Sequence, residues 1–144
     1  MSEGSSPIPS GAFGDRVRRR LRDEQVIWLS TVGADGTPQP NPVWFLWEEP
    51  GTLLVYNRDD AHRLTHLRSR PQVAAHLDGD GRGGDIVVLS GVGRIAADRP
   101  GPPEHPEYRA KYEHAMVRVS GSVEEFGRAY PIAVEVAVSR VRGF

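Results

Sequence analysis

Three prolines at alternate positions, Pro38, Pro40 and Pro42, mark the first segment of the sequence that could contact a ligand. In a strand, the N–H groups of residues i and i+2 point to the same side, so these prolines strip one edge of its donors. That edge must border solvent, a gap in the sheet or a ligand. One interpretation is an edge strand protected against aggregation. The other is a gap in a barrel, lined by Asn41, Pro42, Val43 and Trp44.

A second segment combines Tyr56-Asn57-Arg58 with a predicted helix that begins near Asp60 and ends near Ser69. At about 100° per residue, His62, Arg63 and His66 fall on one helix face, and the leucines at 64 and 67 lie toward the other. A helix start also favours an anion through its free N–H groups. The expected cap, Asp59 or Asp60, would compete for those groups. A phosphate site is predicted, with a solvated basic face as the alternative; its residues are Tyr56, Asn57, Arg58, His62, Arg63 and His66.

Other chemistries have weaker support in the residues. His62 and His66 at i and i+4, with His76 as a third ligand, lack the H-E-x-x-H pattern, so no metal site is predicted. The run from Gly91 to Ala96 has the letters of a dinucleotide fingerprint, but the following Asp-Arg-Pro prevents a helix from opening there. We therefore interpret its glycines as bulges or close-packing points in a strand.

Composition excludes several classes of protein. The 144 residues suffice for one domain, and the absence of cysteine removes disulfides and thiolate nucleophiles. A net charge of −1, without aromatics interleaved among basic residues, argues against a nucleic-acid partner. No apolar run approaches the roughly 18 residues that span a bilayer, and no signal-peptide core is present. We expect no membrane contact and a cytoplasmic location.

The elements that would position these residues are mostly strands. Strands are predicted at 26–32, 37–48, 52–57, 72–77, 86–97 and 131–141, and helices at 12–23, 60–69, 107–117 and 123–129. Six strands without β-α-β alternation predict a mainly β protein, an antiparallel barrel with peripheral helices. Residues 1–11 are expected to be a disordered tail, and residues 12–144 a single domain.

Four motifs, taken in order, resemble a known family: Trp28-Leu-Ser-Thr-Val-Gly-Ala-Asp-Gly36, Pro40-Asn-Pro-Val-Trp-Phe45, Leu54-Val-Tyr-Asn-Arg58 and Leu64-Thr-His-Leu-Arg-Ser-Arg-Pro-Gln-Val73. The chain resembles the pyridoxamine-phosphate-oxidase-like, FMN-binding split β-barrels, and within them the actinobacterial branch that uses the deazaflavin coenzyme F-420. The resemblance covers most of residues 12–142.

The resemblance implies a six-stranded split barrel that forms a homodimer, with cofactor sites at the subunit interface. It places the strand of Asn41 to Phe45 against the ring system, and Tyr56 to Arg58 with the following helix at the phosphate. The family usually has lysine where this chain has Arg63, and often asparagine where it has His66. The implied function is hydride transfer by coenzyme F-420 to a small unsaturated or quinone-like acceptor. The alternatives are an FMN-dependent oxidoreductase and a non-catalytic cofactor carrier.

Overall fold

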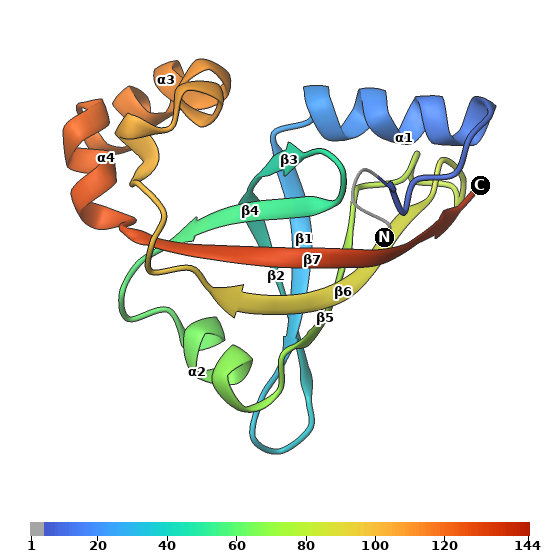
Figure 1. Ribbon diagram of the computed structural model, residues 1–144, viewed down its shortest axis with the longest axis horizontal. Coiled ribbons are helices and arrows are strands. Elements are labelled where there is room, and N and C mark those ends of the chain that lie inside the picture. The colour runs from blue at the N-terminus through green and yellow to red at the C-terminus, as the bar shows by residue number, and fades with distance from the viewer. Residues whose placement is uncertain (1–4) are drawn as a thin grey trace.

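The computed structural model describes residues 5–144, which form a curled antiparallel sheet with helices at its periphery (Figure 1). The mainly β, split-barrel prediction is confirmed, since the sheet curls into a half-barrel whose two edge strands do not pair with each other. Its seven strands follow the order β2-β1-β5-β6-β7-β4-β3. The strands are β1 (Val26–Val32), β2 (Pro38–Trp44), β3 (Leu46–Glu48), β4 (Thr52–Asn57), β5 (Gln72–His76), β6 (Val87–Ile95) and β7 (Ile132–Gly143).

The predicted strand count of six was wrong by one, because the segment 37–48 divides into β2 and β3 at Phe45. The N–H of Phe45 donates to the Tyr112 hydroxyl at 2.9 Å, and its carbonyl accepts from that hydroxyl at 2.8 Å and from Lys111 Nζ at 3.1 Å. Both backbone groups of Phe45 are thus hydrogen-bonded to side chains that lie 66 and 67 residues later in the sequence. Phe45 therefore leaves the strand ladder.

The helices are α1 (Ala12–Asp23), α2 (His62–Ser69), α3 (Pro106–Ser120) and α4 (Val123–Ala129), with a 3-10 turn at Pro102–Glu104. Figure 1 shows α1 along one side of the barrel, α3 and α4 together at one end, and α2 directly after β4. The chain enters α2 from the end of β4, through the short connection that contains Arg58.

β4 is buried on both faces, which explains its continuous apolar sequence. Leu53 and Val55 belong to the core inside the barrel, together with Val17 and Leu21 of α1. Leu54 and Tyr56 point the other way, into a second core beneath α3 and α4. β4 therefore joins the barrel interior to the C-terminal helices.

The interpretation of Gly91 as a close-packing point is confirmed. The register between β6 and β7 shifts between Ser90 and Gly91, as a β-bulge does. A Cβ atom at Gly91 would lie 2.2 Å from the carbonyl oxygen of Ala137, so no larger residue fits without moving the backbone. The glycines here serve packing in the sheet.

The N-terminal segment is packed for part of its length. Ile8 is 4% exposed and belongs to the barrel core, so the disorder expected for residues 1–11 does not extend through it. Apolar contact with the barrel holds this residue in place. Residues 1–4 of the expected tail lie outside the described residues.

Two further observations concern residues 5–144 alone. None of their helices combines the length and the apolarity that a bilayer crossing needs. Their histidine, aspartate and glutamate side chains form no group of three or more arranged to hold a metal ion.

Candidate functional site

The barrel is split between β2 and the second half of β4. β2 pairs only with β1, and β3 pairs with β4 no further than Leu54. Beyond Leu54, one edge of β4 has no strand partner within the described sheet. Val43 and Trp44 of β2 and Tyr56 of β4 line one cavity in this gap. The gap predicted beside residue 42 is therefore present.

The free edge of β2 has carbonyl acceptors but almost no N–H donors. Pro38, Pro40 and Pro42 lie opposite Val32, Ser30 and Trp28 in the register with β1. Proline has no N–H, so the hydrogen bonds of this ladder use the intervening residues, and the proline carbonyls point away from β1. The interpretation as a donor-poor edge is confirmed. Along β2 the free edge presents no N–H before that of Trp44.

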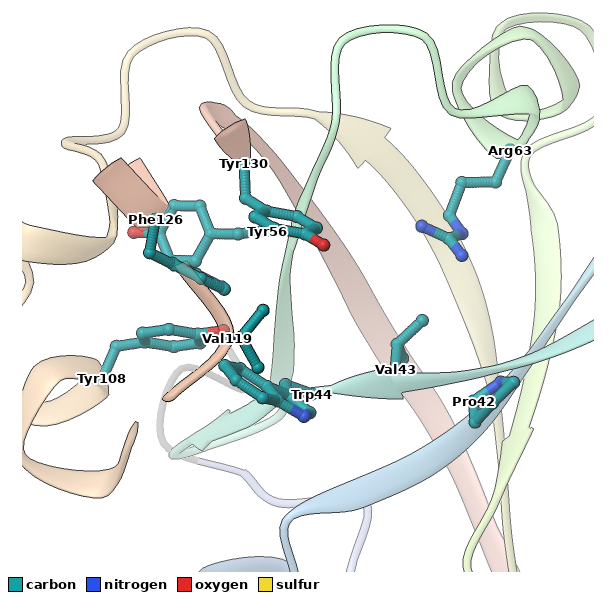
Figure 2. A pocket seen from close by; sticks show the side chains of 9 residues that line it. All are labelled: Pro42, Val43, Trp44, Tyr56, Arg63, Tyr108, Val119, Phe126 and Tyr130. Atoms are coloured by element: carbon teal, nitrogen blue, oxygen red, sulfur yellow. The ribbon is translucent and has the colours of Figure 1, made fainter. Parts of the chain in front are cut away.

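We call the first cavity the aromatic cavity; it has a volume of about 270 Å³. Its residues come from β2, β4, α2, α3, α4 and the segment after α4, and Figure 2 shows them around the space: Pro42, Val43, Trp44, Tyr56, Arg63, Tyr108, Val119, Phe126 and Tyr130. The Trp44 ring stacks on Phe126 at 5.2 Å, and Phe126 stacks on Tyr130 at 4.5 Å. Stacking fixes these side chains in one column along the cavity.

We call the second the basic cavity; it has a volume of about 440 Å³. It lies between β2 and α2 and is lined by Thr31, Gln39, Asn41, Ala61, His62, Arg63 and His66. This lining has three basic side chains and no acidic one. His66 Nδ1 lies 2.8 Å from the Thr31 hydroxyl oxygen, which orients the imidazole toward the cavity wall. An anion would be favoured here.

Arg63 lines both cavities and is held in place by Asn57. Its guanidinium donates to Asn57 Oδ1. The Asn57 amide nitrogen in turn donates to the carbonyls of Val55 at 3.1 Å and Ile132 at 3.0 Å. Asn57 is 1% exposed, so it acts through Arg63 and lines neither cavity. Burial lowers the pKa of Arg63, because desolvation penalises the charged form.

Arg58 lies elsewhere than the sequence suggested. It is exposed, and its guanidinium carbon sits 5.0 Å from the centre of the Tyr130 ring. It lines neither the aromatic nor the basic cavity. A cation–π contact with an aromatic residue 72 positions later is invisible in a local pattern.

The cap predicted for α2 was wrong. The N-cap residue is Ala61, and no side chain caps the helix. Asp59 and Asp60 are both exposed. Neither carboxylate therefore competes with an anion for the N–H groups of the first turn, and the positive end of the helix dipole stays available. The buried Leu64 and Leu67 confirm which face of α2 meets the barrel.

The sequence reasoning missed the aromatic residues that α3 and α4 bring to the site. Tyr108, Phe126 and Tyr130 line the aromatic cavity, and Tyr112 stacks on the inner face of Trp44 at 5.0 Å. The i, i+4 spacing of Tyr108 with Tyr112 and of Phe126 with Tyr130 was a signal for a helix face. It could not indicate that this face meets Trp44.

A charged cluster anchors the start of α3. The Glu48 carboxylate accepts hydrogen bonds from Arg99 and, at 3.0 Å, from His105 Nε2, and Arg99 also donates to Glu135 at 2.6 Å. His105 Nδ1 accepts the N–H of Tyr108 at 3.2 Å, which caps the helix. Burial opposes ionisation of Glu48, but the hydrogen bonds from Arg99 and His105 outweigh it and lower its pKa. The cluster thus fixes Tyr108 beside the aromatic cavity.

Comparisons with known proteins identify the family of this chain. The sequence profile of the family described as pyridoxamine 5'-phosphate oxidase matches residues 13–142. Among curated proteins, no sequence matches. An F-420 reductase has a similar structure, with 18% identity over 94% of this chain and 98% of that chain and a TM-score of 0.68.

Two further solved structures show the breadth of this fold. A conserved hypothetical protein from Mycobacterium tuberculosis is 18% identical over 97% of this chain and 88% of its own, with a TM-score of 0.62. The heme storage protein HutZ from Vibrio cholerae is 12% identical over 92% and 95%, also with a TM-score of 0.62. At these identities the likeness concerns the fold alone.

Proposed function

The chain belongs to the pyridoxamine 5'-phosphate oxidase family, and from this premise we propose that it is an oxidoreductase that binds coenzyme F-420. The observation that carries the proposal is a convergence: the donor-poor edge of β2 and the Arg63-bearing helix meet at two cavities that share Arg63. An F-420 reductase is among the solved proteins with this fold. The acceptor is a small unsaturated or quinone-like compound.

The basic cavity is the proposed phosphate site. Arg63 offers guanidinium donors beyond the one that Asn57 occupies, and a guanidinium suits the oxygens of a phosphate. His62 and His66 line the same cavity. The uncapped first turn of α2 adds backbone N–H groups to these side chains.

The free edge of β2 favours a deazaflavin over FMN. The N5 atom of an oxidised flavin accepts a hydrogen bond, whereas a deazaflavin has a C–H at that position. An edge whose N–H groups are replaced by Pro38, Pro40 and Pro42 offers carbonyl oxygens instead, and these accept from ring N–H groups. This edge leaves the N5 acceptor of a flavin without a backbone donor along β2 before Trp44.

When bound, the cofactor would supply hydride transfer to the acceptor. The chain's own residues would bind the cofactor and orient it. Arg63 and the start of α2 hold the anion, the β2 edge fixes the ring, and Trp44 with the α4 aromatics excludes water from one side.

The proposal includes a homodimer with the cofactor at the subunit interface. The outer face of β1, β5 and β6 carries apolar side chains that reach solvent. Trp28 stacks on His76 at 6.3 Å between neighbouring strands, and Val92 is 49% exposed. An exposed apolar face of this kind supports the proposal that this surface is the dimer interface.

Titration of the purified apoprotein with F-420 and with FMN tests the proposal. We expect clearly tighter binding of F-420, followed by absorbance and fluorescence of the cofactor. Tighter binding of FMN would select the flavin alternative of the same fold. Stopped-flow mixing of bound, reduced F-420 with quinones and enones tests turnover. Inertness toward all of them would favour a cofactor carrier.

A further inference from the structure

The aromatic cavity adjoins the proposed ring position along β2, but most of its lining plays no part in holding phosphate. Trp44, Phe126 and Tyr130 form its wall as parallel rings, with interplanar angles of 13° and 19° between neighbours. Their faces cover one another, so their edges line the cavity. Tyr112 closes the inner end of this column and Arg58 the outer end. The wall is preorganised and would lose little freedom on binding an apolar ligand.

Besides Arg63, two tyrosine hydroxyls supply polar groups to this cavity. The hydroxyls of Tyr56 and Tyr112 hydrogen-bond to backbone groups. Within residues 5–144, the hydroxyls of Tyr108 and Tyr130 make no such bond to the backbone. Figure 2 shows the Tyr130 hydroxyl on the side of the cavity that faces Arg63. Tyr108 is 1% exposed, and burial raises its pKa, so this hydroxyl stays protonated at neutral pH. Both hydroxyls can donate to a ligand oxygen.

We propose that the aromatic cavity is the acceptor subsite and that it takes single-ring conjugated carbonyl compounds, such as a benzoquinone or a cyclic enone. The apolar wall suits the ring, and the two hydroxyls suit the carbonyl oxygen. A volume of about 270 Å³ admits one small ring system and is too small for a tetrapyrrole macrocycle. The redox role of this subsite rests on the proposed function; the binding itself does not.

Val119 provides a way to fill the cavity without disturbing the core. It lies on the last turn of α3, lines the cavity and is 53% exposed. Val119→Trp would place a large ring in the opening. Val117→Trp is the matched control, because Val117 is 46% exposed on the same helix and does not line the cavity. Both variants should fold, since neither position is buried.

The experiment measures binding of duroquinone, a one-ring quinone, to the apoprotein by isothermal titration calorimetry. We expect V119W to weaken duroquinone binding at least tenfold and V117W to leave it within twofold of wild type. Tyr130→Phe should weaken it about fivefold, the usual effect of one lost hydrogen bond. Equal duroquinone affinity in V119W and wild type, or no binding to wild type, would overturn the inference.

Two further measurements separate this inference from the proposed function. F-420 affinity should be unchanged in V119W, because Val119 does not line the basic cavity. Failure of wild type to bind F-420, with duroquinone binding still sensitive to V119W, would refute the redox function and leave the ring site standing. Hemin binding that V119W abolishes would overturn the size limit.

Discussion

Replacing Arg63 by alanine should weaken binding of the anionic cofactor more than any other single change in the basic cavity. Arg63 is the one arginine or lysine among the residues that line the two cavities, and one of its donors is committed to Asn57. A hydrogen bond to a charged group contributes about 1.5–3 kcal/mol. At about 1.4 kcal/mol per tenfold, Arg63→Ala should raise the Kd for F-420 on the order of 10- to 100-fold.

The variant must be shown to be folded, because it leaves Asn57 Oδ1 without its guanidinium partner. We expect a loss of about 1 kcal/mol in the free energy of unfolding, measured by urea denaturation. Arg68→Ala is the matched control. Arg68 lies on the same helix and is exposed, but it borders a different surface groove with Pro71 and Val92.

The assay is a fluorescence titration of each variant with F-420 at about 0.15 M salt, where the Debye length of about 8 Å screens remote charges. Arg68→Ala should change the Kd by less than about threefold, since it alters only the remote charge. An unchanged Kd in Arg63→Ala would refute the phosphate assignment. An equal loss in both variants would show that the effect is net charge and not a contact.

Two further predictions concern stability and assembly. Glu48→Gln should lower the free energy of unfolding at pH 7 by about 1–3 kcal/mol, because Arg99 loses a partly buried ionic partner. The pKa of Glu48 is lowered in the folded state, so the stabilisation from its carboxylate is present above the ordinary pKa of 4.5 and is lost as the pH falls through the lowered pKa. In urea denaturation between pH 7 and pH 3, the free energy of unfolding of the variant should therefore fall less steeply with pH than that of wild type. Val92→Arg should convert the proposed dimer to a monomer in analytical ultracentrifugation while the circular dichroism spectrum stays unchanged. A wild-type protein that sediments as a monomer would contradict the dimer.

Much of the site follows from short-range patterns. The prolines at alternate positions define a strand edge without donors, whatever the rest of the fold, because the missing N–H is a property of the residue. The helical period places Arg63 on one face of α2 and Leu64 on the other, and burial of the leucines decides which face stays open. Asn41, Val43, His62 and His66 were predicted in this way and line the two cavities.

The misplaced or missed features all depend on contacts between distant segments. Asn57, predicted among the cofactor-binding residues, lines neither cavity: its amide nitrogen donates to carbonyls of β4 and β7, and its oxygen accepts from Arg63. Arg58 was predicted at the phosphate, but its guanidinium lies over the ring of Tyr130. Each outcome depends on which side chain a distant element brings within reach.

By itself the sequence determined the strand-rich architecture, the donor-free edge at Pro38, Pro40 and Pro42, and the basic face of the helix after β4. These depend on residue type and on periods of two or 3.6 residues, which are local. Only the tertiary structure decided that Phe45 leaves the ladder and that α3 and α4 wall one side of the split with stacked rings. The physical reason is that a buried hydrogen bond or ring stack forms only when packing of the whole chain brings both partners together.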